Sequence, residues 1–122
     1  MMSKRTARLR LVLPVAVFLV IAPALAQQAV PALTGRVVDQ AGILSEATEQ
    51  TLTTLLAAHE AETSNQVAVL TVPSLEGETI EAFALRVAET WALGTAERDN
   101  GALLVVAVDD RKLRIEVGYG LE

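Results

Sequence analysis

Residues 99–120 read DNGALLVVAVDDRKLRIEVGYG, in which an apolar run and an alternating run are joined by a charged turn. The run at 102–108 has no polar face, which is typical of a strand buried on both sides of a sheet. At 113–117, Leu, Ile and Val alternate with Arg114 and Glu116, which indicates a strand exposed on one face. The short charged link leaves room only for a tight turn, so the segment predicts a β-hairpin.

Two helix patterns precede this hairpin, and each follows a short strand pattern. Ser45 is predicted to cap the first helix and Thr79 the second, because a hydroxyl side chain accepts hydrogen bonds from the free amides at a helix start. Gly94 is predicted to stop the second helix. The two strand patterns occupy residues 36–39 and 66–72.

The order of elements is therefore β-α-β-α-β-β, which predicts an α/β fold with a mixed sheet that ends in the hairpin. Helices of this length serve as crossovers between parallel strands. Right-handed crossovers would place both helices on the same face if the strand order runs in one direction. The buried stripes are predicted to be Leu52, Leu55 and Leu56 in the first helix, and Ile80, Phe83, Ala84, Val87, Ala88 and Trp91 in the second.

The N-terminal part of the chain differs from the rest in composition. A head with four Lys and Arg residues precedes an apolar run at 11–22, and residues 24–26 (ALA) have the small-x-small pattern of a cleavage site. We interpret 1–26 as a signal peptide that is cut off, 27–34 as a tether and 35–122 as the domain. A retained membrane anchor is the alternative, but the apolar run is shorter than the roughly 18–20 residues that span a bilayer.

Removal of the signal peptide leaves six Lys and Arg against fifteen Asp and Glu, a net charge of −9. Such a surface disfavours nucleic acid and anionic lipid, and no direct bilayer insertion is expected after cleavage. The expected location is periplasmic or secreted. The chain has no Cys and one histidine, His59, which argues against a disulfide, a catalytic thiolate and a zinc site.

Carboxylates at strand ends are the main candidates for chemistry. Asp39 follows the first strand, and Asp109 and Asp110 follow the third, so parallel strands would bring these side chains to one edge of the sheet. Oxygen ligands of this kind suit Ca²⁺ or Mg²⁺. Alternatively, Asp39 caps the nearby turn, and Asp109 and Asp110 are ordinary hairpin residues. Spacing alone leaves both interpretations open.

A second candidate site lies at the opposite end of the third strand, at Asp99 and Asn100. Antiparallel pairing would bring these residues near 118–120, although Asp-Asn-Gly is also a common turn sequence. Arg111 and Arg114 are candidates for holding a phosphate, because guanidinium groups form paired hydrogen bonds with phosphate oxygens. A solvated hairpin face is the alternative for these two arginines.

Several motifs together resemble the TPM domain family. They are VDQAGILS at 38–45, QVAV at 66–69, LEG at 75–77, IEAFA at 80–84, WALG at 91–94, DNG at 99–101 and DRKLRIEVGYG at 110–120. The resemblance covers residues 33–122 and implies an α/β/α sandwich, an exported or lumenal location, divalent-cation binding in some members and acid phosphatase activity in a plant member. The family usually continues past the GYGLE motif, so we expect the C-terminal helices of the domain to be missing here.

Two functions are consistent with these features. The first is an exported module that binds a divalent cation and supports assembly or repair of envelope membrane complexes, with an envelope or membrane protein complex as its partner. The alternative is a metal-assisted acid phosphatase, in which Asp39, Asp109 and Asp110 hold the ion and an arginine stabilises the developing charge. We favour the first, because no nucleophile or general base stands out in the sequence.

Overall fold

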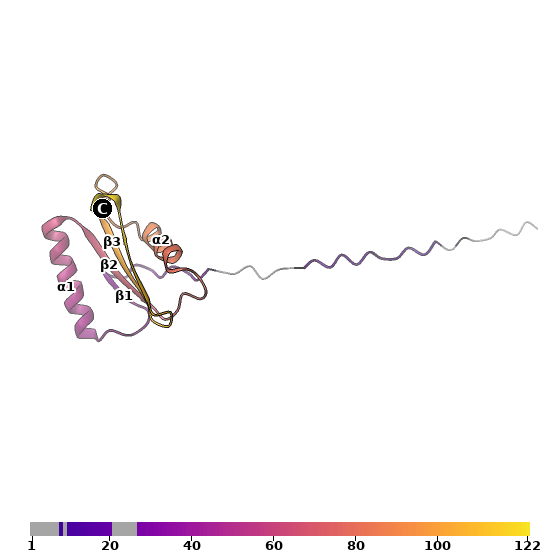
Figure 1. Ribbon diagram of the computed structural model, residues 1–122, viewed down its shortest axis with the longest axis horizontal. Coiled ribbons are helices and arrows are strands. Elements are labelled where there is room, and N and C mark those ends of the chain that lie inside the picture. Colours follow the sequence, from indigo (N-terminus) through magenta and orange to yellow (C-terminus); the bar gives the residue numbers. More distant parts are fainter. Residues whose placement is uncertain (1–7, 9, 21–26) are drawn as a thin grey trace, which may run out of the picture.

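The computed structural model describes residues 8, 10–20 and 27–122 (Figure 1). Residues 1–7, 9 and 21–26 of the predicted signal peptide lie outside the described residues, and the signal peptide stays a prediction. Residues 10–20 have no regular secondary structure, and their side chains are exposed. Within the described ranges, no helix is both long and apolar enough to cross a membrane.

Within residues 27–122, four strands and two α-helices follow one another in the predicted order. They are β1 (Val37–Asp39), α1 (Glu46–Thr63), β2 (Gln66–Val72), α2 (Ile80–Trp91), β3 (Gly101–Ala107) and β4 (Lys112–Val117), followed by the 3-10 turn η1 (Tyr119–Leu121). The strand order is β1-β2-β3-β4. The first three strands are parallel and β4 is antiparallel to β3, which confirms the predicted α/β fold with a mixed sheet.

Both predicted helix caps are present. The Ser45 hydroxyl accepts a hydrogen bond from the Thr48 amide at 3.1 Å, and the Thr79 hydroxyl accepts one from the Ala82 amide at 3.2 Å. Each bond satisfies an amide that has no partner within its own helix. The sequence therefore fixes both starting points locally.

The end of α2 differs from the prediction. The helix ends at Trp91, because Ala92 takes the left-handed conformation (φ 49°) two residues before the predicted stop at Gly94. Gly94 instead permits a close backbone approach: a Cβ at this position would lie 2.5 Å from the amide nitrogen of Gly101. The glycine therefore determines how the loop reaches β3.

One face of the sheet is sealed by α2. The register places alternate residues of β2 opposite alternate residues of β3, and all of them are buried beneath the helix. The strand residues are Ala68, Leu70 and Val72 on β2 and Leu103, Val105 and Ala107 on β3. The helix contributes Ile80, Phe83, Ala84, Val87 and Trp91, with Ala88 partly buried. The predicted stripe of the second helix is confirmed.

Residues 28–31, predicted as part of a tether, pack alongside α2. The Arg86 guanidinium donates to the Gln28 carbonyl at 3.0 Å, and the Trp91 indole N–H donates to the Pro31 carbonyl at 2.8 Å. Val30 packs against the buried core. This segment belongs to the folded unit although it lacks the periodicity of a helix or strand.

The helix α1 lies on the face of the sheet opposite α2 (Figure 1). It contacts β1 and β2, and no residue of α1 is fully buried. The strand order does run in one direction, and for this order right-handed crossovers would place both helices on one face. The expectation that the helices share a face was therefore wrong. Because they lie on opposite faces, the two crossovers have opposite hands. On the other face, residues 28–31 pack beside α2.

The β3–β4 half of the face that carries α1 is left uncovered by the described residues. Leu113 and Ile115 are 66% and 62% exposed, and Val117 is exposed as well. Between them, Arg114 and Glu116 are less exposed, because they project to the α2 side. The predicted alternation is present, but the apolar side of β4 faces solvent.

The buried stripe predicted for α1 was partly wrong. Leu52 and Leu56 are half-buried against the sheet, whereas Leu55 is 62% exposed. The half-buried residues of α1 are spaced three or four positions apart along one side of the helix, and Leu55 does not lie on that side. The position of a residue around the helix axis therefore predicts its burial better than its being a leucine.

Replacement of Phe83, which is fully buried, tests where the core lies. Phe83→Ala is expected to lower the free energy of unfolding by about 3–5 kcal/mol, because the core loses packing and retains a cavity. Leu55→Ala on the exposed side of α1 is the matched control, with an expected change within about 0.5 kcal/mol. Urea unfolding followed by circular dichroism measures both, and equal losses would contradict this account of the core.

Candidate functional site

The carboxyl ends of β1, β2 and β3 lie at one edge of the sheet. Backbone bonds hold the ends together: the Val108 amide donates to the Val72 carbonyl at 3.1 Å, and the Asp109 amide donates to the Pro73 carbonyl at 2.9 Å. Asp39 closes β1 at the same edge, in register with Thr71 of β2. The structure thus places the three predicted ligands at one edge of the sheet, Asp39 at the end of β1 and Asp109 and Asp110 in the turn after β3.

Both carboxylate oxygens of Asp39 accept hydrogen bonds. Oδ1 accepts from the Thr71 hydroxyl at 2.5 Å and from the Ile43 amide at 3.2 Å. Oδ2 accepts from the Leu44 amide at 2.9 Å. Burial raises the pKa of Asp39, but these bonds favour the charged form more strongly, so the pKa lies below its ordinary value of 3.8. Asp39 therefore closes the loop that leads into α1, as the turn-capping alternative proposed.

The two aspartates of the hairpin turn have different surroundings. Oδ2 of Asp110 accepts a hydrogen bond from the Leu75 amide at 2.8 Å and ties the turn to the loop after β2. Asp109 is exposed, and its side chain bonds no described residue. Among residues 8, 10–20 and 27–122, no three His, Cys, Asp or Glu side chains form a group that could hold a metal ion. Asp109 and the second oxygen of Asp110 remain available, so the cation site stays a prediction.

Asn100, in the second candidate site, is 3% exposed and joins two loops. Its Oδ1 accepts a hydrogen bond from the Thr95 amide at 3.0 Å. Its Nδ2 donates to the Ser64 carbonyl at 2.9 Å, at the C-terminal end of α1. A buried amide with these bonds fixes the start of β3 relative to α1 and presents no free atom to a ligand.

Asp99 holds the segment that follows β4. Its Oδ2 accepts a hydrogen bond from the Tyr119 amide at 2.9 Å, and its carbonyl accepts one from the Gly120 amide at 3.0 Å. A Cβ on Gly118 would lie 2.2 Å from the Asp99 carbonyl oxygen. The Asp-Asn-Gly and Gly-Tyr-Gly motifs therefore meet, as antiparallel pairing predicts, and the contact requires glycine.

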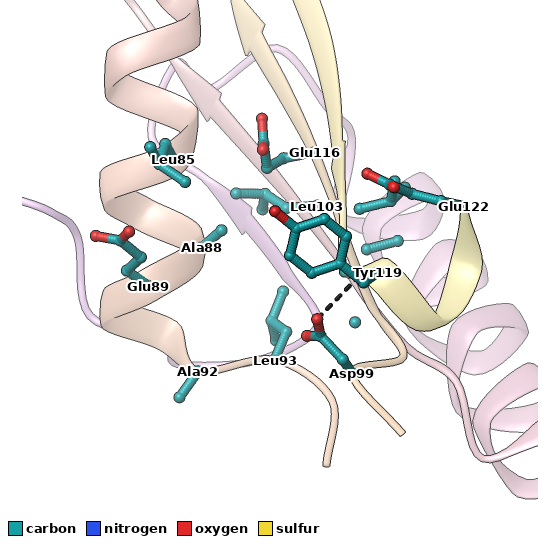
Figure 2. Close-up of a pocket in the computed structure, with 14 residues that line it drawn as sticks. Leu85, Ala88, Glu89, Ala92, Leu93, Asp99, Leu103, Glu116, Tyr119 and Glu122 are labelled. Atoms are coloured by element: carbon teal, nitrogen blue, oxygen red, sulfur yellow. Dashed lines mark hydrogen bonds between the residues drawn. The ribbon is translucent and has the colours of Figure 1, made fainter. Parts of the chain in front are cut away.

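A cleft of about 460 Å³ lies between α2, the β3–β4 pair and η1, and Asp99 lines it (Figure 2). Figure 2 shows Leu85 and Ala88 of α2 on one side and Tyr119 and Glu122 on the other. The apolar lining residues include Leu85, Ala88, Leu93 and Leu103, and the acidic ones are Glu89, Asp99, Glu116 and Glu122. An apolar wall beside several carboxylates suits a ligand that combines positive charge with an apolar body.

Sequence reasoning missed three carboxylates of this cleft, Glu89, Glu116 and Glu122. Glu89 lies one helical turn after Leu85 on α2, and Glu116 lies opposite Leu103 in the β3–β4 register. The i, i+4 spacing on a helix and the hairpin register contained the signal. These two patterns could be combined into one site only once α2 was known to pack on the side of β4 to which Glu116 projects.

The two candidate phosphate-binding arginines have separate surroundings. Arg114 Nε donates to Glu116 Oε2 at 2.9 Å, in an ion pair within β4. Arg111 is exposed in the hairpin turn, in the left-handed conformation with φ 52°. Arg111 therefore lies near the aspartates of the turn, whereas Arg114 is engaged within the strand, and phosphate binding stays a prediction.

Asp39→Asn tests the role of this carboxylate in the loop. At pH 7 the variant is expected to lose about 1–3 kcal/mol of unfolding free energy, because bonds to a charged acceptor are weakened. The wild-type advantage is complete above the unfolded-state pKa of about 3.8 and is lost as the pH falls through the lower folded-state pKa. Urea unfolding from pH 7 to pH 2 measures the convergence.

Asp109→Asn is the control for this measurement, because it removes a carboxylate from the same sheet edge without breaking a side-chain hydrogen bond to a described residue. It should leave stability at pH 7 unchanged within about 0.5 kcal/mol. A difference between Asp39→Asn and wild type that persists at pH 2 would refute the role assigned to the Asp39 charge.

Comparison with known proteins gives a family and several similar solved structures, among them the following two. The family profile described as the TPM domain matches residues 37–122. The N-terminal domain of a P. gingivalis protein superposes with a TM-score of 0.67 at 40% identity, over 73% of this chain and 57% of that one. The N-terminal domain of a Corynebacterium glutamicum protein gives 0.61 at 16% identity, over 78% and 64%. This chain thus spans less than two thirds of either neighbour, and no curated protein matches it.

Proposed function

The chain belongs to the TPM domain family, and from this premise we propose that it is an exported, periplasmic or secreted module that supports assembly or repair of membrane complexes in the cell envelope. The uncovered apolar half of the sheet carries this proposal. Contiguous apolar surface of this kind marks contact sites for other molecules. The excess of Asp and Glu over Lys and Arg disfavours an anionic lipid surface and favours a protein partner.

We name this surface the open face. Its members are paired in the β3–β4 register: Leu104 lies opposite Ile115, and Val106 lies opposite Leu113. Leu104 and Val106 are half-buried, whereas the β4 residues are largely exposed. The side chains form one continuous strip, since residues directly opposite on one face of an antiparallel pair are in contact. A partner helix or strand that covers the strip would remove it from water.

A photocrosslinking residue placed on the open face tests the proposal. With the residue at Leu113, exported protein in intact cells is expected to crosslink to an envelope membrane protein, because this side chain lies within the strip. The control position is Glu81, which is exposed on α2 outside the strip. Mass spectrometry identifies the products. The absence of heterologous products at Leu113, or identical products at both positions, would contradict the proposal.

The proposed module also binds Ca²⁺ or Mg²⁺. Asp109 and the second oxygen of Asp110 are the available carboxylate ligands at the sheet edge. Two carboxylate ligands are fewer than the sequence suggested, and backbone carbonyls and water would complete the shell of a hard cation. The acidic composition of the domain supports such an ion. A metal-assisted acid phosphatase remains the competing function.

Titration with Ca²⁺ or Mg²⁺ tests this part of the proposal. The melting temperature is expected to rise with cation concentration, because an ion that binds only the folded state stabilises it. Asp109→Ala should abolish the rise, and Glu62→Ala, which removes an exposed carboxylate on α1, should not. An unchanged melting temperature would refute the cation site. Cation-dependent hydrolysis of a generic phosphate ester, lost in Asp109→Ala, would establish the phosphatase instead.

A further inference from the structure

Among residues 8, 10–20 and 27–122, no strand pairs with the outer side of β4, so β4 is an edge strand of the described sheet. The Gly118 amide donates to the Gly101 carbonyl at 2.9 Å, and the residues bonded to the neighbouring strand alternate along an antiparallel pair. The even-numbered residues of β4 therefore bond β3. The amides and carbonyls of the odd-numbered residues point to the open edge, and these residues are Leu113, Ile115 and Val117. Such a row of unpaired groups is a template for another strand.

We propose that two copies of this chain pair through β4, antiparallel and centred on Ile115, so that two four-stranded sheets become one. In this register Leu113 of one copy lies opposite Val117 of the second copy, and the two Ile115 side chains lie opposite each other. On the α2 side, Arg114 of each copy lies opposite Glu116 of the other. A two-fold axis repeats both kinds of contact, as an isologous interface requires.

The charge order of β4 favours this register over its neighbours. Pairing centred on Arg114 would place Arg114 opposite its own copy, and pairing centred on Glu116 would do the same with Glu116. Like charges directly opposite destabilise a strand pair, whereas opposite charges stabilise it. A shift of one residue would continue the apolar face of one copy into the charged face of the other. The order Leu-Arg-Ile-Glu-Val is therefore self-complementary about its centre.

Pairing would satisfy the open-edge amides and carbonyls of all three odd-numbered residues in each copy. It would also join the two open faces into one apolar strip bordered by an α1 helix at each side, because α1 covers only β1 and β2. Dimerisation through β4 does not require an envelope partner. A second copy occupies the edge of β4, whereas such a partner would cover the face.

Charge exchange at two positions tests the pairing. Sedimentation velocity over a range of concentrations is expected to show a reversible dimer for the wild type. Arg114→Glu alone places Glu opposite Glu, and Glu116→Arg alone places Arg opposite Arg, so each should weaken dimerisation at least about tenfold. A wild type that stays monomeric at all concentrations would overturn the proposal.

A mixture of the two single variants separates pairing between copies from the ion pair within β4, where Arg114 and Glu116 of one chain are in contact. The Arg114→Glu copy presents two acids and the Glu116→Arg copy presents two bases, so the mixture should form a heterodimer although neither variant dimerises alone. Circular dichroism checks that both variants are folded. Folded variants that dimerise as well as wild type, or a mixture that stays monomeric, would overturn the proposed register.

Discussion

The fold depends on the burial of β3, which bonds β2 on one side and β4 on the other. Its odd-numbered residues are sealed beneath α2, and this layer contains nearly all fully buried side chains among the described residues. Its even-numbered residues lie on the other face, where α1 reaches only β1 and β2. This unequal cover holds the domain together from one side and leaves an apolar strip on the other.

Much of the fold could be predicted from local patterns. The hairpin, the strand boundaries and the Ser45 and Thr79 caps each depend on residues close in sequence. The face of the sheet on which each helix packs could not be predicted in this way. Alternation of apolar and polar residues shows that a strand has two different sides, but it does not show which side a distant segment covers. The role of residues 28–31 was invisible for the same reason, since it arises from single bonds to α2 such as that between Trp91 and Pro31.

The candidate sites show a similar division. Strand-end reasoning placed Asp39 and Asp110 at the correct edge, but it could not show that backbone amides of nearby loops already bond both carboxylates. Loops need acceptors for their amides, and short acidic side chains supply them. Asn100 is the clearest case, because a motif that suggested a site proved to be a buried connection between α1 and β3. The acidic cleft beside α2 became visible only with the helix in place.

The central claim is that β4 is bonded on one side only and is open on the other. Amide hydrogen exchange, followed residue by residue by NMR in dilute protein, tests it most directly, because an amide bonded within the sheet exchanges slowly. The account predicts slow exchange at Arg114 and Glu116 and fast exchange at Leu113, Ile115 and Val117. Uniformly slow exchange along β4 in the dilute monomer would contradict it.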